Sequence, residues 1–388
     1  MKNLFLISFL LFLTPLMSQT IGTFSSVAPT AQTQQFVIPS THRFQKLIQG
    51  GDPLTGGGVL KERPDFTCYV PIAGSSTNGY ISLNHEDYPG GISILDVNYS
   101  NITKLWSMTN AQAADLTAIS GLTIANCSGG LTPWGTVLSA EEYVSTTDLN
   151  FDGYNDSGWL IEVDPVTRVA IRRLWALGCM AHENAAVSAD GKTIYFGADN
   201  VTNGYLFKFV CTTANDPSAG KLSVLKLTGG GNGDWVEIPN TSQADRNNTI
   251  ALSLAAGAAN ISRIEDVEIG PDGKIYIAGT YTQEVYRLTD NGLTVSNYET
   301  YVSNQCYTIN AICEPYGYAG EAGNDNLAFD GEGNLWILQD GGRNHIWVVA
   351  PTHTVGGTNG VRLFATTPEG AEPTGITFSP DYKFMFIS

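Results

Sequence analysis

A hairpin that recurs along the chain restricts its fold more than any other feature of the sequence. Each copy has an alternating strand, a tight turn that carries an acidic residue, and a more apolar strand. Four copies align clearly and span residues 182–197, 265–279, 325–338 and 374–387. The Asp-Gly or Glu-Gly turn of the first three copies, placed between such strands, is typical of a β-hairpin.

The spacing of these hairpins predicts the architecture. With two looser relatives upstream, equivalent positions fall near residues 79, 135, 191, 273, 333 and 382, so the steps are 56, 56, 82, 60 and 49 residues. Units of three or four strands at such a period are typical of a propeller, whose blades pack against their neighbours. Six units predict an all-β, six-bladed β-propeller: a single closed domain with long insertions between strands, the longest at residues 211–260. The alternative, a two-sheet β-sandwich, does not explain the repeat.

The two ends of the chain predict its processing and its closure. A charged start and a short apolar run, Leu4 to Met17, are typical of a signal peptide, so we expect residues 1–18 to be removed and residues 19–388 to form the propeller. This predicts a secreted or periplasmic protein. The last hairpin reaches Ser388, so we expect that the last blade is truncated, that residues 35–48 close the ring by pairing with it, or both.

Charge and hydropathy exclude several classes of partner. Asp and Glu outnumber Lys and Arg by 37 to 20, a net charge of −17. Nucleic-acid binding needs a basic footprint, so it is not expected. After the signal segment, no apolar run approaches the ~20 residues of a membrane span. We expect a monomer that acts on a small molecule.

Acidic residues recur at one position of the hairpins. Counting seven residues back from the acidic turn residue leads to Glu183, Glu265 and Asp325, and in the last copy to Thr374, with Glu372 two residues earlier on the same strand face. The first strand of each blade lines the channel of a propeller, so these carboxylates should form a ring. Like charges this close repel one another, and hard cations such as calcium would neutralise them. The alternative is a water-filled acidic channel with at most one structural calcium.

Further candidate ligands come from the two looser repeats and from the neighbours of the ring. Glu141 and Glu142 end one strand, and Glu86 ends another within Asn84-His85-Glu86. Two residues next to the ring positions are additional candidates, namely His182 and Asn326.

Arg263 is the candidate for contacting an anion. It lies two residues before Glu265, on the same strand face. A guanidinium beside a metal cluster offers a forked pair of donors to phosphate oxygens. An ordinary salt bridge to a neighbouring acid is the alternative.

A separate segment matches the spacing of a calcium loop. Oxygen-bearing side chains stand at positions 1, 3, 5 and 9, with Gly153 at position 6; they are Asp148, Asn150, Asp152 and Asp156. Trp159 stands where a bidentate glutamate is expected. We interpret the segment as a peripheral calcium loop, with a polar turn as the alternative.

The six cysteines suit an exported protein. An even count is compatible with disulfides, and the closest pair, Cys306 and Cys313, could close a small loop. No Cys-x-x-Cys occurs, so the sequence does not indicate a zinc or redox site of that type.

Taken in order along the chain, these segments resemble the PhoX-type alkaline phosphatases of bacteria. The resemblance covers nearly the whole chain after the signal segment. It rests on Gly51–Leu54, Asn84–Glu86, Gly130–Thr136 with Glu141-Glu142, Ala176–Gly178 with His182-Glu183, Tyr205–Val210, Arg263–Asp266, Asp325–Asp330 with Asn334–Ile337, and Ala371–Gly375.

The resemblance implies a six-bladed propeller whose channel holds calcium and iron and which hydrolyses phosphate monoesters outside the cytoplasm. By motif, Glu183, Glu265 and Glu372 resemble metal ligands and Arg263 resembles the arginine that contacts phosphate. Ala140 stands where the family typically has a cysteine that binds iron, and the signal segment lacks paired arginines. These departures favour calcium (Ca2+) over iron (Fe3+), with Cys127 and Cys179 as alternative thiolates.

The leading hypothesis is therefore a secreted, metal-dependent phosphatase in which Arg263 and Glu265 act at the reacting phosphoryl group. Two alternatives remain. One is a calcium-dependent lactonase or esterase, which needs a channel metal but no anion clamp. The other is a non-catalytic propeller with structural metals.

Overall fold

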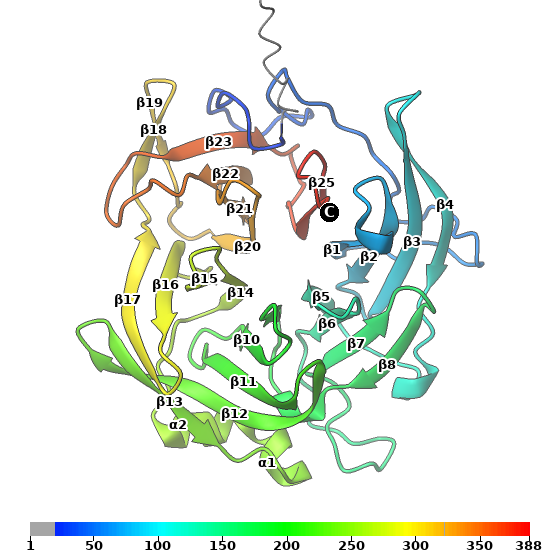
Figure 1. Ribbon diagram of the computed structural model, residues 1–388, viewed down its shortest axis with the longest axis vertical. Helices are drawn as coiled ribbons and strands as arrows, with labels where there is room; N and C mark the ends of the chain where they lie inside the picture. Colours follow the sequence, from blue (N-terminus) through cyan, green and yellow to red (C-terminus); the bar gives the residue numbers. More distant parts are fainter. Residues whose placement is uncertain (1–19, 322) are drawn as a thin grey trace, which may run out of the picture.

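The structure is a computed structural model that describes residues 20–321 and 323–388. The expected signal segment, residues 1–18, lies outside the described residues. Nearly all of the regular secondary structure in the described chain is β-strand, and the sheets stand around a central opening (Figure 1). No described helix is long and apolar enough to cross a membrane.

Three of the sheets have four antiparallel strands each, paired in chain order. The first contains β1 (Pro64–Pro71), β2 (Asn78–His85), β3 (Gly91–Ser100) and β4 (Leu105–Ala113). The second contains β5 (Asn126–Leu131), β6 (Val137–Glu141), β7 (Leu160–Asp164) and β8 (Val169–Arg173). The third contains β20 (Asn324–Phe329), β21 (Leu335–Gln339), β22 (His345–Val349) and β23 (Val361–Thr366).

A nine-stranded sheet joins two further groups of strands. One group is β9 (Ala186–Val187), β10 (Thr193–Gly197), β11 (Leu206–Thr213), β12 (Asp216–Gly229) and β13 (Asn232–Ile238). The other is β14 (Ile264–Ile269), β15 (Ile275–Gly279), β16 (Glu284–Asp290) and β17 (Thr294–Val302). The expected excursion at residues 211–260 forms the long strand β12, then β13, which pairs with β17, and the helices α1 (Gln243–Asn247) and α2 (Thr249–Ala256).

Smaller elements complete the chain. β18 (Cys306–Ile309) pairs with β19 (Ile312–Pro315), and β24 (Ile376–Phe378) pairs with β25 (Met385–Ile387). Three short 3₁₀ helices span Ile72–Gly74, Thr117–Ile119 and Trp175–Leu177.

The first strands of the hairpins form a closed ring. β1 contacts β5, β5 contacts β9, β9 contacts β14, β14 contacts β20, β20 contacts β24, and β24 contacts β1. In Figure 1 these strands lie nearest the centre, with the other strands of each group outside them. The fold is therefore all-β and propeller-like. In the first two sheets the innermost strands, β1 and β5, lie before the looser repeats that the sequence showed. The sequence analysis missed them because neither strand is followed by an acidic-glycine turn.

The predicted turns have the backbone that their residues favour. Gly191, Gly273 and Gly333 have φ of 66°, 75° and 80°, the left-handed region that glycine enters without a side-chain clash. Tyr382 replaces glycine in the last hairpin and also has a positive φ, 54°. The apolar strands beside these turns pack between neighbouring sheets; the largest cluster, for example, joins Leu138 and Leu160 of the second sheet to Phe196 and Phe207 of the next.

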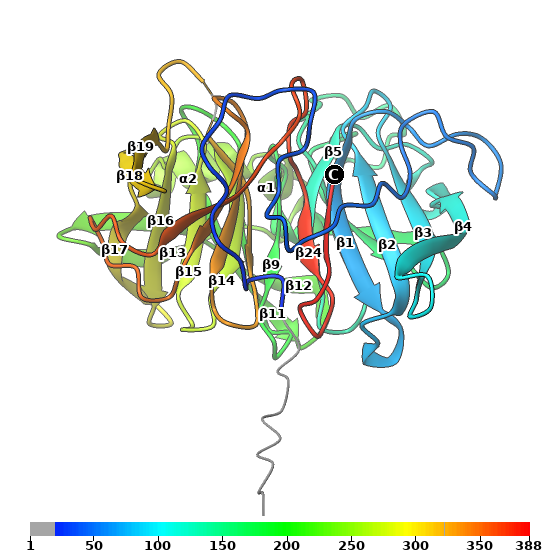
Figure 2. The ribbon, with the colours of Figure 1, turned by 90° about the horizontal axis from the view of Figure 1, so that it is seen from above.

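Residues 36–50 cross the outside of the β24–β25 hairpin (Figure 2). Their one strand-like pairing among the described residues is a bridge between Val37 and Thr366 of β23, in the preceding sheet. The expectation that residues 35–48 pair with the last hairpin is thus wrong. The segment covers that hairpin with side chains instead, because Phe36 and Ile38 pack on one side of it and Leu47 and Ile48 on the other.

Candidate functional site

The ends of the inner strands enclose an acidic cavity of about 80 Å³. Its lining is eight carboxylates, one guanidinium and one hydroxyl: Asp65, Glu86, Glu142, Glu183, Arg263, Glu265, Thr280, Asp325, Asp340 and Glu372. The structure thus brings together six of the predicted residues that carry a carboxylate, with Arg263 beside them. They come from strands far apart in sequence and meet only because the ring closes.

Two stacked rings of equivalent positions explain this lining. The first ring is the inner-strand position of Glu183, Glu265 and Asp325, and in the first two sheets Asp65 and Cys127 occupy the equivalent position. The second ring lies one or two residues after the end of the neighbouring strand of each hairpin. Its backbone N–H donates to the carbonyl two residues before the first-ring residue, from Glu86 to Arg63, Glu142 to Ala125, Asp199 to Ala181, Thr280 to Arg263, and Asp340 to Gly323.

The sixth hairpin departs from the pattern. Ile376 occupies its first-ring position. Ser388 occupies its second-ring position, where its backbone N–H donates to the carbonyl of Thr374. Glu372 supplies the carboxylate on this side from just before β24.

A β-bulge turns the first-ring side chains toward the centre. The register of the inner hairpin shifts between Pro64 and Thr67, between Asn126 and Gly129, between Ile264 and Asp266, and between Asn324 and Leu327. Each shift contains or adjoins a first-ring residue. Bulges of this kind re-aim a side chain and often lie next to active sites.

Burial and mutual repulsion raise the pKa values of the cavity carboxylates. Burial, followed by the charges of Asp199 and Glu86, raises the pKa of Glu142 to about 8. Burial, followed by Asp340 and Glu86, raises the pKa of Glu372 to about 7. The pKa values of four others are raised well above the usual range, again by burial first and then by neighbouring acids: Asp65, Glu183, Glu265 and Asp325. Ionised together, these groups need a positive partner.

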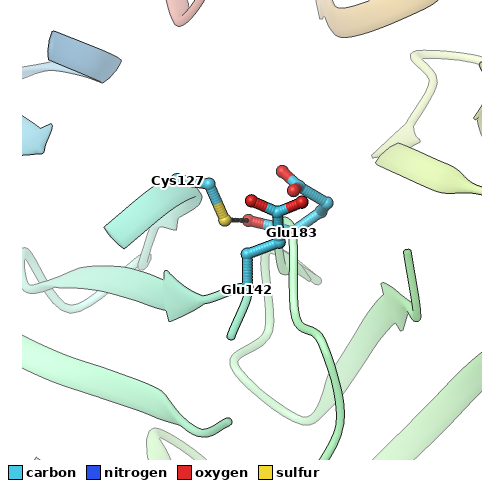
Figure 3. Close-up of side chains that lie close together, drawn as sticks. All are labelled: Cys127, Glu142 and Glu183. Atoms are coloured by element: carbon cyan, nitrogen blue, oxygen red, sulfur yellow. Dashed lines mark hydrogen bonds between the residues drawn. The ribbon is translucent and has the colours of Figure 1, made fainter. Parts of the chain in front are cut away.

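The donor set fits metal ions. Two groups of side chains have ligand atoms within 4.8 Å of one another: Cys127, Glu142 and Glu183 form one, and Glu183, Asp199 and Glu265 form the other. Figure 3 shows the first group converging, with Cys127 on β5, Glu142 just after β6 and Glu183 on the loop before β9. Glu183 is common to both groups, so two cations could share it. Asp65 Oδ1 is buried and has no hydrogen-bond partner among the described residues, as expected of a ligand atom without its cation.

Arg263 is the cationic residue of this cavity. Its Nε and Nη2 bond Asp199 Oδ1 and Oδ2 at 2.8 and 2.9 Å, and Nη2 also bonds Glu265 Oε1. These bonds raise the pKa of the guanidinium. The side chain keeps 33% of its surface exposed. Arg263 therefore forms the salt bridge that was the alternative, at the edge of the acidic cavity, and its contact with an anion stays a prediction.

Glu141 is not part of the cavity, which corrects the prediction that both adjacent glutamates are ligands. Its buried carboxylate accepts hydrogen bonds from Thr123 Oγ1 at 2.8 Å and from the backbone N–H groups of Gly158 and Trp159 at 3.1 and 3.2 Å. Arg173 lies 3.5 Å away. Adjacent strand residues point to opposite faces, so only Glu142 can reach the centre.

His182 and Asn326 also lie outside the cavity lining. His182 Nε2 bonds the carbonyl of Gly178 at 2.9 Å, and burial lowers the pKa of its ring to about 4. Asn326 Nδ2 donates to Ser128 Oγ of β5 at 3.1 Å, and its Oδ1 accepts from the N–H of Gly375, next to β24. Asn326 thus links β20 to β5, which is not its neighbour in the ring, and to the segment that leads into β24. The prediction that His182 and Asn326 are additional ligands is therefore wrong. Each is the neighbour in sequence of a first-ring residue, and its side chain is directed away from the cavity.

Three acids of the site were missed from the sequence: Asp65 and Asp340 line the cavity, and Asp199 belongs to the second ligand group. Asp65 is the second residue of β1, whose hairpin lacks the acidic turn used for the count. The other two follow the second strand of a clear hairpin. A hairpin brings the end of its second strand beside the start of its first, so counting from both strands would have found them.

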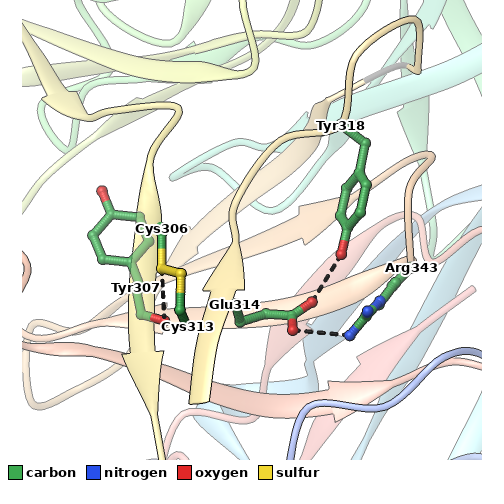
Figure 4. The surroundings of a disulfide bond; sticks show 6 residues. All are labelled: Cys306, Tyr307, Cys313, Glu314, Tyr318 and Arg343. Carbon is green, nitrogen blue, oxygen red and sulfur yellow. Dashed lines mark hydrogen bonds and ion pairs between the residues drawn. A yellow bond between two sulfur atoms is a disulfide. The ribbon is translucent and has the colours of Figure 1, made fainter. Parts of the chain in front are cut away.

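The cysteines divide between the centre and the periphery. Cys127 occupies the first-ring position of the second sheet, with its thiol beside Glu142 and Glu183, and Ala140 is buried in the same hydrophobic cluster as Cys127. Cys179 is bonded near the periphery, to Asn155 Nδ2 at 3.4 Å. Cys306 and Cys313 form the expected disulfide across the β18–β19 hairpin, next to Glu314 and its partners Tyr318 and Arg343 (Figure 4). The thiol that reaches the carboxylates is thus Cys127.

Two tyrosines lie close to the acids at the surface. Tyr88 and Tyr143 are 60% and 49% exposed, and their rings meet edge to face with centroids 5.8 Å apart. Besides burial, the charges of Glu142 and Glu86 raise the pKa of Tyr88, so the ring lies near both. This pair offers an apolar contact beside the cavity.

The predicted calcium loop lies on the periphery. Asp148 accepts the backbone N–H groups of Asp152 and Gly153 at 3.1 and 2.9 Å, and Asp156 accepts that of Leu149 at 3.0 Å. Asn150 Nδ2 bonds Asp152 Oδ2 at 3.0 Å. The side-chain oxygens thus serve the loop's own backbone here, and calcium binding at this loop stays a prediction.

Several solved structures resemble this chain at low sequence identity. No curated protein matches the chain. A periplasmic gluconolactonase from Pseudomonas aeruginosa has 12% identity and a TM-score of 0.46, over 94% of this chain and 87% of its own. A catalytically inactive virginiamycin B lyase from Staphylococcus aureus has 12% identity and a TM-score of 0.41, over 86% and 82%. Hydrazine synthase from Kuenenia stuttgartiensis has 14% identity and a TM-score of 0.42, over 86% and 82%.

One family model covers most of the chain. The model described as alkaline phosphatase PhoX matches residues 105–388, which are 284 of the 388 residues. The matched region contains Cys127, Glu183, Glu265, Asp325 and Glu372, hence most of the acidic cavity. This chain belongs to the PhoX alkaline phosphatase family.

Proposed function

We propose that this protein is a secreted or periplasmic, metal-dependent phosphatase that hydrolyses phosphate monoesters at the acidic cavity. The observation that carries the proposal is the double ring of carboxylates with Arg263 at its edge. We also propose a six-bladed propeller, counting the nine-stranded sheet as two blades and the β24–β25 hairpin as one. A monomer remains our expectation.

The metal centre would be held by both rings. Asp65, Glu183, Glu265 and Asp325 offer hard oxygen ligands suited to calcium, and Cys127 offers a soft ligand suited to iron. Because Cys127 occupies a ring position, the loss of a cysteine at Ala140 does not argue against iron. Bound cations would polarise the phosphoryl oxygens and stabilise the developing charge of the leaving group.

The chain's own residues would bind and orient the substrate. Arg263 shares Asp199 and Glu265 with the proposed metal site, so its guanidinium lies where a phosphate bound there would place its oxygens. A forked donor pair suits the equatorial oxygens of a phosphoryl group, whose charge spreads in the transition state. Burial of the carboxylates keeps bulk water from screening these interactions.

The test is hydrolysis of a chromogenic phosphomonoester at alkaline pH, after chelation and after calcium, or calcium with iron, is restored. Activity should depend on added metal and should fall at least 100-fold in Glu183→Gln. Glu237→Gln, in an exposed pair with Lys221, is the matched control and should retain activity. Correctly folded, metal-loaded protein that cleaves lactones but no phosphomonoester would contradict the proposal, and so would a protein that cleaves neither.

A further inference from the structure

One position of the inner strands carries a long cationic side chain twice. It lies two residues before the first-ring residue, and its carbonyl accepts the backbone N–H of the second ring. In chain order the five residues at this position are Arg63, Ala125, Ala181, Arg263 and Gly323. Alanine and glycine present no polar side chain, so of these five residues the two arginines can offer a charge to a ligand.

Arg63 and Arg263 approach the acidic cavity from opposite sides. Both have a left-handed backbone, with φ of 47° and 54°. Arg63 O accepts the N–H of Glu86 at 3.1 Å, and Arg263 O accepts that of Thr280 at 3.0 Å, so the two backbones are held in the same way. The strands that follow them, β1 and β14, are three steps apart in the ring of inner strands, whichever way the ring is followed (Figure 1).

The two arginines differ in their partners. Arg263 is bound to Asp199 and Glu265 and lines the cavity. Arg63 is exposed and lies outside the lining, and its guanidinium makes neither a hydrogen bond nor an ion pair within the part of the chain that the structure describes. It is still close to the rim, because burial raises the pKa of Glu86 and the charge of Arg63 is the strongest effect against this rise. Arg63 can therefore bind an anion without giving up a partner.

Tyr88 is held beside Arg63 at this rim. Lys61 Nζ donates to the carbonyl of Pro89 at 2.8 Å, which ties the segment before β1 to the loop between β2 and β3. Burial and nearby acids raise the pKa of Tyr88, and the charge of Arg63 opposes them, so the two side chains are close. The ring of Tyr143 meets that of Tyr88 edge to face. Aromatic surface and an exposed guanidinium thus adjoin each other outside the cavity.

The leaving group of a substrate has to lie at this rim. The acidic cavity has a volume of about 80 Å³, enough for a few water-sized groups. Metal ions and a phosphoryl group would fill it, so the rest of a phosphomonoester would project outward. The rim carries Glu86, Glu142 and Asp340, which repel an anionic substituent. Arg63 is the residue that can reverse this repulsion on the side of β1.

We propose that Arg63 is a specificity-determining residue that binds a second anionic group, a carboxylate or a phosphate, on the leaving group of a phosphomonoester. The inference rests on the proposed function. Hydrolysis adds water across the P–O bond and releases inorganic phosphate and the hydroxy acid that Arg63 has held. A guanidinium binds either anion through a forked pair of donors. Because Arg63 lies outside the cavity, it does not touch the reacting phosphoryl group and is not a catalytic residue.

The test compares 4-carboxyphenyl phosphate with 4-carbamoylphenyl phosphate, which have similar shapes and differ in charge. The ratio of their kcat/KM values, charged over neutral, should fall about fivefold in Arg63→Gln, the size of effect that an exposed ion pair supports. The change should lie in KM, should shrink in high salt, and should be partly restored in Arg63→Lys. Lys104→Gln removes an exposed charge from the β3–β4 turn and should leave the ratio unchanged.

A binding measurement supports the kinetic one. In calorimetry with metal-loaded protein, 4-carboxybenzylphosphonate should bind more tightly than 4-carbamoylbenzylphosphonate, and Arg63→Gln should lose this preference. Hydrolysis of both phosphates with the same ratio in folded Arg63→Gln, or equal binding of the two phosphonates by the original protein, would overturn the inference and leave the proposed function standing. Hydrolysis of neither phosphate would refute the proposed function, and the inference with it.

Discussion

Replacing Glu183 by Gln should change stability with opposite sign in metal-free and metal-loaded protein. Glu183 belongs to both candidate ligand groups, whose ligand atoms lie within 4.8 Å of one another. At that separation and an effective dielectric constant of ~20, two full charges repel by about 3 kcal/mol. Protonation relieves part of this, since burial and neighbouring acids raise the pKa of Glu183. We therefore expect Glu183→Gln to stabilise chelated protein at pH 8 by about 1–2 kcal/mol.

In calcium the same variant should be the less stable protein. A cation that binds only the folded state stabilises it by about 2.7 kcal/mol at a concentration of 100 times Kd. The variant loses a charged ligand from both groups, so most of this gain should disappear.

Thermal unfolding of Glu183→Gln and of the original protein, with chelator and with calcium, measures both effects. Shifts of a few degrees are expected, because ~1 kcal/mol corresponds to about 2–4 °C in domains of 150–250 residues and to less in a longer chain. Glu237→Gln, at an exposed pair, should change neither curve. The reasoning is refuted if Glu183→Gln lowers Tm in chelator and leaves the calcium-induced rise intact.

Other predictions follow from the same cavity. Cys127→Ser should lower iron retention at least tenfold by metal analysis, whereas Cys211→Ser, in a hydrophobic cluster, should not; equal retention would exclude Cys127 as a ligand. Arg263→Ala should lower kcat/KM for phosphomonoesters by about 10²–10³, with partial recovery in Arg263→Lys, and an unchanged value would remove it from the phosphate site. Tyr143→Ala should reduce kcat/KM for aryl phosphates relative to glycerol phosphate several-fold, and a ratio that does not change would argue against a contact with the leaving group. The raised pKa of Glu142, about 8, means that the folded, metal-free protein binds more protons than the unfolded chain between pH ~4.5 and 8. The stability of the metal-free protein should therefore fall as pH rises through that window, and calcium should reverse this trend. A Tm that rises with pH in the presence of chelator would contradict this prediction.

The sequence was sufficient where structure is local. Apolar alternation and the Asp-Gly or Glu-Gly turns set the hairpins, and the count from the turn located Glu183, Glu265 and Asp325 in one ring. Within a hairpin the register follows from the turn, so a position counted from it is reliable. The same count could not reach Asp65 or Cys127, since their hairpins lack the acidic turn.

The tertiary structure decided what depends on closure and on side-chain direction. Sequence spacing left Glu141 and Glu142 equivalent, but the β6 strand buries Glu141 among backbone donors and leaves only Glu142 at the centre. Pairing across their hairpins brought Asp340 to the cavity and Asp199 to the second ligand group, and a bulge adjoins Cys127 of the first ligand group. Each of these placements depends either on a contact between residues distant in the chain or on a single-residue shift of register. The pattern of apolar residues along the sequence reveals neither of them. The sequence by itself therefore determined the repeated hairpins and the acidic character of their inner ends, whereas ring closure alone determined which of those acids meet.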